Sequence, residues 1–170
     1  MRPLKATINH QALLSNFKYI KKVANQSKVM SVLKANAYGH NLIDVAKTLK
    51  KSDGFAVLSI DEAIQLRKNN FDQTILLLEG FFGKEEVNIA SELKINVTVH
   101  NQRQIDLINQ SKPITPINIH LKINTGMNRL GFMPDEISYL LEEFNSNPYV
   151  GDIILMTHFS TADEKKGIKE

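Results

Sequence analysis

Three polar segments follow apolar runs of this 170-residue chain and carry the side chains best suited to chemistry. The first begins at Lys34, directly after Val32 and Leu33. A lysine at the end of a buried strand is desolvated, and desolvation lowers the pKa of its amine and makes it a nucleophile toward an aldehyde. From the residue type alone, a solvated or ion-paired lysine is the commoner outcome.

The second segment runs from Lys122 to Phe132 and contains two glycines and Arg129. Glycine allows backbone turns and the close approach of a ligand, and arginine offers a planar, permanently charged fork for a carboxylate or phenolate oxygen. The third segment covers residues 157–160, where His158 could bond to or stack on a flat cofactor. Taken singly, the two segments are more often explained by an ordinary loop with a salt bridge and by a structural histidine.

Short runs rich in β-branched and aliphatic residues recur along the chain and predict six buried strands. They cover residues 29–33, 55–59, 75–78, 97–99, 117–123 and 153–156. Stretches with helical spacing lie between these strands. They include Leu13, Phe17, Ile20 and Ala24 on one face behind an Asn9 N-cap, then 42–49, 63–67, and 137–144 behind Asp135.

Continuous apolar strands separated by helical connections are typical of parallel β/α units with both faces of the sheet covered. Six strands at this spacing fit an open doubly wound sheet or most of a (β/α)8 barrel, and periodicity does not distinguish the two. A closed barrel needs eight strands, so a barrel here would be incomplete, with free edges on its first and sixth strands. In both folds reactive side chains gather at the carboxyl ends of the strands, where the three polar segments begin.

The composition, 42% hydrophobic and 23% charged residues, is that of an ordinary globular protein. The net charge of +3 comes from scattered lysine pairs rather than a basic block, which argues against a nucleic-acid partner. Cysteine is absent, which excludes thiolate catalysis and cysteine-bound metals and fits a cytoplasmic location. No apolar run approaches the roughly 20 residues of a membrane span, so no membrane partner is expected.

Several common active-site motifs are missing from the sequence. It contains no glycine-rich dinucleotide or P-loop string, no His-Glu-x-x-His helix and no Gly-x-Ser-x-Gly elbow. Asp61, Glu62 and Asp163 could in principle bind a metal together with a histidine. Their positions are more typical of helix starts, where a carboxylate complements the helix dipole, and we expect no metal site.

The three polar segments also match three sequence strings of one enzyme family. Residues 32–40 match Val-x-Lys-Ala-Asn-Ala-Tyr-Gly-His along their whole length. Residues 122–131 are similar to Lys-x-Asp-Thr-Gly-Met-x-Arg-Leu-Gly, and residues 157–163 are similar to Thr-His-Phe-x-x-Ala-Asp. In order and approximate spacing these strings resemble the pyridoxal-phosphate alanine racemases, and the resemblance extends over essentially the whole chain.

This resemblance implies a (β/α)8 barrel, followed in the family by a β-rich C-terminal domain, in a homodimer that interconverts L- and D-alanine for cell-wall peptidoglycan. Residues 1–170 would form part of the N-terminal barrel domain, about six of its eight β/α units, without the C-terminal domain. Lys34 would hold pyridoxal 5'-phosphate as a Schiff base and move the α-proton on one face of the cofactor. In the family a tyrosine of the partner subunit serves the other face.

The resemblance assigns roles to further residues. Tyr38 matches the tyrosine near the cofactor phosphate, and His158 matches the histidine beside the ring. Arg129 matches the arginine that contacts the phenolic oxygen of the cofactor and the substrate carboxylate. Lys122 matches a lysine that is carbamylated in many members and then pairs with that arginine. Asn124 stands where the family usually has Asp, which removes one negative charge near Arg129.

Three other interpretations stay open. A racemase of broader specificity, for serine or lysine, would share the lysine string. A single-barrel pyridoxal-phosphate protein without racemase activity is less favoured, because its family lacks that string. The third is an inactive fragment. A racemase needs proton transfer on both faces of the cofactor, and no second base is identified here, so we expect the isolated 170-residue chain to be inactive.

Overall fold

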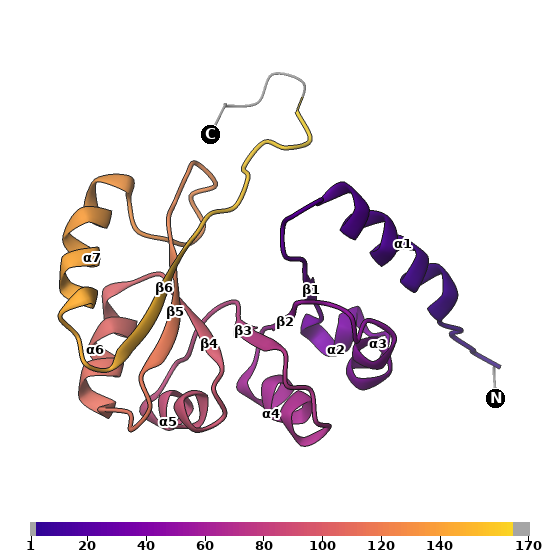
Figure 1. Cartoon of the computed structure of the whole chain (residues 1–170), viewed down its shortest axis with the longest axis horizontal. Coiled ribbons are helices and arrows are strands. Elements are labelled where there is room, and N and C mark those ends of the chain that lie inside the picture. Colours follow the sequence, from indigo (N-terminus) through magenta and orange to yellow (C-terminus); the bar gives the residue numbers. More distant parts are fainter. Residues whose placement is uncertain (1–2, 165–170) are drawn as a thin grey trace.

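The computed structural model describes residues 3–164, and its centre is a parallel sheet of six strands in the order β1 to β6. The strands are β1 (Met30–Val32), β2 (Gly54–Val57), β3 (Thr74–Leu77), β4 (Asn96–Val99), β5 (Ile117–Lys122) and β6 (Val150–Met156). The helices are α1 (His10–Val23), α2 (Lys34–Tyr38), α3 (Leu42–Thr48), α4 (Ile60–Lys68), α5 (Lys84–Glu92), α6 (Gln102–Ser111) and α7 (Ile137–Asn145), with a 3-10 turn η1 (Pro134–Glu136). Helices α3 to α7 follow the outer side of the curved sheet (Figure 1).

The order of the strands decides between the two folds that the sequence allowed. A doubly wound sheet reverses its strand order at a switch point, whereas a barrel adds each strand beside the previous one. Here each strand pairs in parallel with the next along the chain, from β1 to β6. The six predicted strands and the barrel-type fold are therefore confirmed. Among residues 3–164, β1 and β6 each have one neighbour, as expected for an incomplete barrel.

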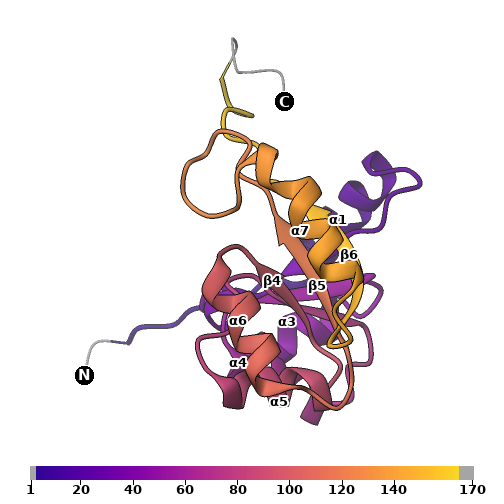
Figure 2. The same cartoon turned by 90° about the vertical axis from the view of Figure 1, so that its left-hand side faces the viewer.

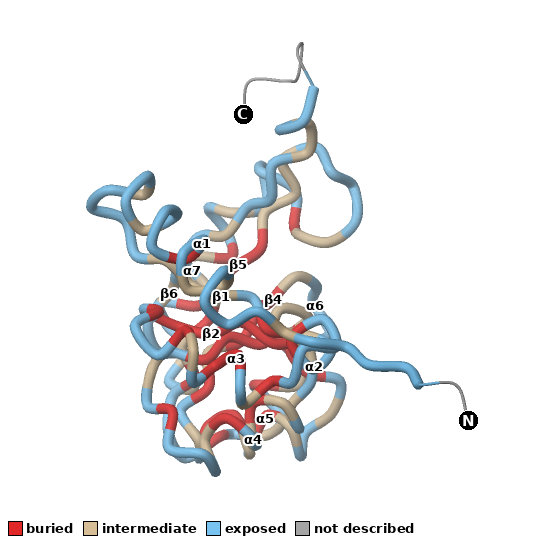
Figure 3. Tube along the Cα trace, turned by 90° about the vertical axis from the view of Figure 1, so that its right-hand side faces the viewer, coloured by how far each residue is buried: buried red, intermediate tan, exposed pale blue. Residues whose placement is uncertain are grey.

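The hydrophobic core lies between the sheet and its helices. All four residues of β2 are buried, and Phe55 packs edge-to-face on Phe71, which follows α4, with ring centroids 5.6 Å apart. Such aromatic pairs add packing energy beyond the area that they bury. Figure 3 shows the buried positions along the sheet and the inner sides of the helices, whereas the segments after β5 and β6 are mostly exposed.

Helix α1 is packed less completely than its sequence suggests. Asn9 caps it as predicted, since its side chain accepts the Ala12 N–H at 2.9 Å. Of the apolar face, Phe17 is buried whereas Ile20 is 50% exposed. Among the described elements, α3 is the main packing partner of α1.

Asp53 anchors the end of α1 to the sheet. Its Oδ2 accepts bonds from Lys21 Nζ and from the Val29 N–H, both at 2.6 Å. The Lys21 ammonium and the Val29 amide both favour the charged carboxylate and lower the pKa of Asp53. This contact ties α1 to the start of β1 and the start of β2.

The start of α7 also differs from the prediction. Asp135 is not the N-cap of α7 but lies within η1, the 3-10 turn that precedes the helix. Pro134 begins this turn, because its fixed φ suits the first position of a helix. Glu136 then accepts the Met133 N–H at 2.7 Å. Among residues 3–164, no helix is both long enough and apolar enough to cross a membrane.

Arg67 joins three segments beneath the sheet. Its Nε donates to the Leu93 carbonyl at 2.9 Å and its Nη2 donates to the Lys94 carbonyl at 3.0 Å, at the end of α5. Its Nη1 donates to the carbonyls of Phe71 and Gln73, at 2.6 and 2.9 Å, in the segment that leads into β3. A half-buried guanidinium thus satisfies four carbonyl oxygens that secondary structure leaves free.

Replacing Arg67 by Met should destabilise the fold, because the apolar stem is kept while four acceptors lose their charged donor. We expect the free energy of unfolding to fall by about 2–3 kcal/mol, measured by urea denaturation. Arg103→Met is the matched control, since Arg103 donates a single 3.2 Å bond to Phe82, and its effect should stay within about 0.5 kcal/mol. Equal losses in the two variants would contradict the role given to Arg67.

Candidate active site

Lys34 follows β1 directly, is half-buried, and opens an unusual backbone segment. The residues Ala35 to Tyr38 have φ angles between 52° and 55°, so the short helix α2 has a left-handed turn. We call Ala35–Tyr38 the left-handed turn. L-residues lose roughly 1–2 kcal/mol each in this conformation, so a run of four non-glycine residues depends on support from its surroundings.

Side chains from two neighbouring segments supply part of that support. The Asn36 N–H donates to Glu62 Oε1 of α4 at 2.8 Å. The Asn36 side-chain oxygen accepts the N–H of Leu42, which is the first residue of α3, also at 2.8 Å. Gly39, with φ of 81°, ends the turn and returns its N–H to the Ala35 carbonyl at 2.9 Å. The backbone segment that follows Lys34 is therefore held by hydrogen bonds to α3 and α4.

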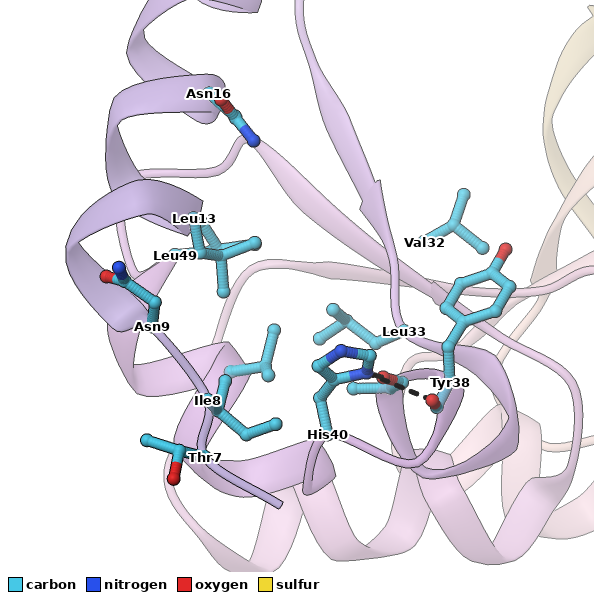
Figure 4. Close-up of a pocket in the computed structure, with 12 residues that line it drawn as sticks. Thr7, Ile8, Asn9, Leu13, Asn16, Val32, Leu33, Tyr38, His40 and Leu49 are labelled. Atoms are coloured by element: carbon cyan, nitrogen blue, oxygen red, sulfur yellow. Dashed lines mark hydrogen bonds between the residues drawn. The ribbon is translucent and has the colours of Figure 1, made fainter.

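The left-handed turn forms one wall of a cavity of about 420 Å³. Tyr38 and His40 line this cavity together with Val32, and Figure 4 shows the Tyr38 ring rising from the turn. His40 Nδ1 lies 3.0 Å from the Tyr38 carbonyl and is the donor there, since a carbonyl can only accept. Of the predicted site residues, Tyr38 lines this cavity and Lys34 does not.

Lys122 ends β5 and is only 8% exposed. Side-chain alternation places His120 on the same face of the strand, where its Nε2 lies 3.4 Å from Asn96 Nδ2 of β4. Burial lowers the pKa of His120. Burial also lowers the pKa of the Lys122 amine, and the nearby positive charge of Arg129 lowers it further. No carboxylate among residues 3–164 pairs with Lys122.

The segment after β5 folds into a loop that is closed at its base. The Phe132 N–H donates to the Lys122 carbonyl at 2.9 Å, and the Asn124 N–H donates to the Phe132 carbonyl at 2.8 Å. Gly131 has φ of 122°, and a Cβ there would lie 2.7 Å from the Asn124 nitrogen. Only glycine therefore fits at this crossing, and Arg129 is held between two fixed ends.

Asn124 also organises the inside of this loop. Its Oδ1 accepts the N–H groups of Gly126 and Asn128, at 3.1 and 3.0 Å. Its Nδ2 donates to the Asn128 side-chain oxygen at 3.0 Å, a bond that an aspartate at this position could not donate. The substitution relative to the usual family string thus removes a charge but leaves the loop with an additional hydrogen bond.

The structure brings Lys122, Arg129 and His158 to one region. Thr125 donates to the His158 carbonyl at 3.4 Å, and Figure 2 shows the loop after β5 beside the segment after β6. Arg129 and His158 are both exposed. Lys34 lies after β1 at the opposite edge of the sheet, and no hydrogen bond or ion pair within the described chain links it to these three residues.

Of the three carboxylates considered for metal binding, Asp61 and Glu62 lie at a helix start as expected, whereas Asp163 lies in a turn after β6. Ser59 accepts the Glu62 N–H at 3.3 Å while Glu62 Oε2 accepts the Ser59 N–H at 3.4 Å, which makes a capping box for α4. Asp61 lies in the first turn of the same helix. Within residues 3–164, no group of three His, Asp or Glu side chains is placed to hold a metal ion.

Sequence reasoning missed the left-handed turn, the bond from Asn36 to Glu62 and the burial of His120. Asn36 and Gly39 carried a weak signal for the turn, because asparagine and glycine tolerate positive φ better than other residues. The alternation of β5 carried a signal for His120, which lies two residues before Lys122.

Comparison with known proteins agrees with this geometry. The family described as alanine racemase, N-terminal domain, matches residues 8–170. The alanine racemase of Burkholderia mallei is 41% identical over 169 residues, which are 99% of this chain and 48% of that protein. The alanine racemase of Nitrosomonas europaea is 44% identical over 163 residues, which are 96% of this chain and 45% of that protein.

Among solved structures, the biosynthetic alanine racemase of Pseudomonas aeruginosa superposes with a TM-score of 0.92 at 36% identity, covering 98% of this chain and 47% of that one. The chain thus spans about half the length of the curated relatives that it matches. The TM-score shows that the sequential parallel sheet of this chain has the same fold as the matched part of that solved structure. The chain therefore belongs to the alanine racemase family and corresponds to its N-terminal domain.

Proposed function

We propose that the full natural protein is a pyridoxal-phosphate-dependent racemase that interconverts L- and D-alanine, an isomerase, with Lys34 as its cofactor lysine. The observation that carries the proposal is the position of Lys34, at the carboxyl end of β1 and directly before the left-handed turn that bears Tyr38. Reactive groups of barrel enzymes collect at this end of the strands. Relatives named alanine racemase match the chain over 99% of its length, which supports the same activity.

The side chains at the strand ends fit an aldehyde cofactor that carries a phosphate. They comprise two amines, a phenol, a guanidinium and an imidazole, from Lys34, Lys122, Tyr38, Arg129 and His158. Within residues 3–164 neither amine is neutralised by a carboxylate in an ion pair. Such a set favours anionic ligands, and Lys34 is free to react with a carbonyl carbon.

In the proposed reaction Lys34 would hold the cofactor through its side-chain amine. When bound, pyridoxal phosphate withdraws electron density from the substrate α-carbon, which makes the α-proton removable. Lys34 Nζ then accepts or returns that proton on one face. Arg129 would orient the substrate carboxylate and help to hold the phenolic oxygen of the cofactor. Tyr38 would help to hold its phosphate, and His158 would contact its ring.

The opposite face needs a second proton carrier, because inversion at carbon requires removal on one side and return on the other. We propose that a partner subunit supplies it, in a homodimer of the full natural protein. The remaining barrel strands and a β-rich C-terminal domain stay predictions for the full natural protein. A cytoplasmic location and a role in supplying D-alanine for peptidoglycan also stay predictions. Broader amino-acid specificity is the alternative that substrate profiling would decide.

We further propose that Lys122 is carbamylated. The lowered pKa of its amine leaves more of the neutral form at neutral pH. The lone pair of the neutral Nζ attacks the carbon of CO2, one proton is released to water, and an N-carboxylate of charge −1 results. That anion would pair with Arg129, whose positive charge acts on Lys122. The buried position would then hold a neutralised pair instead of two neighbouring cations.

Borohydride reduction in the presence of pyridoxal phosphate should attach the cofactor to the peptide that contains Lys34, as mapped by mass spectrometry. Lys34→Ala should abolish this label and lower the racemisation rate by at least about a thousandfold, because it removes both the attachment point and a proton carrier. The exposed Lys51 provides the control, since Lys51→Ala should leave label and rate unchanged. Attachment at another lysine would refute the assignment.

Incubation with 13C-bicarbonate should give a carbamate signal in the 13C NMR spectrum that is absent from Lys122→Gln. Because only the neutral amine reacts, the signal should be present at neutral pH and disappear as the pH falls and the amine is protonated. The pKa of the amine is lowered, so the carbamate should persist to lower pH than one on an exposed lysine. An undiminished signal in Lys122→Gln would assign the adduct to another group.

A further inference from the structure

The carboxylate of Glu62 serves two structures at once. A capping box needs only one bond from the acidic side chain to the start of its own helix. Glu62 Oε2 fulfils that role, since it accepts the N–H groups of Leu58 and Ser59 at 3.1 and 3.4 Å. Glu62 Oε1 leaves the helix altogether and accepts the Asn36 N–H at 2.8 Å. The shortest of the three bonds is the one that α4 does not need.

The Asn36 N–H has no acceptor within its own turn. The bonds internal to this segment come from other amides, with Ala37 donating to Leu33 at 2.7 Å and Gly39 donating to Ala35 at 2.9 Å. Glu62 is the acceptor that the described structure gives to Asn36. Because Asn36 lies two residues after Lys34, this bond fixes the direction in which the backbone leaves Lys34.

From this geometry we propose that Glu62 is a positioning residue for Lys34, which it aligns by clamping the left-handed turn to the start of α4. The proposal rests on the proposed function, in which Lys34 is the cofactor lysine. The negative charge strengthens the clamp, since a carboxylate accepts shorter and stronger bonds from backbone N–H groups than a neutral oxygen does. Glu62 itself touches neither substrate nor cofactor in this proposal.

Glutamine at position 62 would separate the two roles of the side chain. It has the shape of glutamate but one acceptor oxygen, and its amide nitrogen would face an N–H group in place of the second. Glu62→Gln therefore weakens the clamp with little change in volume, and Glu62→Ala removes it entirely. Glu86 offers a matched control at the start of α5, because its Oε2 accepts the Phe82 N–H at 2.6 Å beside its own helix. Ser59→Ala is a second control, which removes the α4 cap but leaves the bond to Asn36 intact.

The clamp is measured first by amide hydrogen exchange in the full natural protein without cofactor. Exchange at Asn36 should become about ten- to a hundredfold faster in the Glu62 variants, as expected for loss of a hydrogen bond to a charged group. It should stay unchanged in Glu86→Gln and Ser59→Ala. Unchanged exchange at Asn36 in both Glu62 variants would overturn the proposal, whatever the function of Lys34.

The consequence for Lys34 is measured by the rate of borohydride trapping of pyridoxal phosphate at the residue-34 peptide and by kcat. Both should fall by about ten- to a hundredfold in the Glu62 variants, with KM changed much less, because small misalignments of a reacting group cost rates of this size. The two controls should match the native protein. Faster exchange at Asn36 with native trapping and kcat would overturn the positioning role. Native protein that is never labelled at Lys34 would instead refute the proposed function and remove the basis for this role, while the exchange result would still report on the clamp itself.

Discussion

Parallel pairing of consecutive strands is the constraint on which this structure depends. Each strand adds beside the previous one from β1 to β6, and each connection returns the chain along the outer side of the sheet. Because all strands run the same way, their carboxyl ends lie at the same end of the sheet. Segments that are more than a hundred residues apart along the chain, after β1 and after β6, therefore open at the same end of the sheet.

The strand ends differ in how their polar segments are held. After β5, backbone bonds between Lys122, Asn124 and Phe132 close the loop, and the Asn124 side chain organises its interior. After β1, the left-handed turn is energetically unfavourable by itself and relies on acceptors and donors from α3 and α4. The first loop is shaped mainly from within, whereas the second is shaped by its neighbours.

Electrostatics give this end of the sheet its chemical character. Lys122 is buried near Arg129 without a carboxylate to balance either cation in the described chain, which lowers the pKa of the lysine amine. Acidic side chains are instead used at helix starts, as with Glu62 on α4 and Glu86 on α5. The region is consequently suited to anionic groups, in agreement with the proposed phosphate-bearing cofactor and amino-acid substrate.

The sequence by itself determined the six strands, the Asn9 cap and the polar segments at the strand ends, because apolar periodicity and capping are local properties. The string from Val32 to His40 also identified the family, since so specific a string carries information that periodicity lacks. Barrel order was decided only by the tertiary structure, because pairing between strands is non-local. The same holds for the exposure of Ile20, the burial of Lys122 and the bond from Asn36 to Glu62. Each of these depends on which element packs against the residue, and no local pattern encodes that.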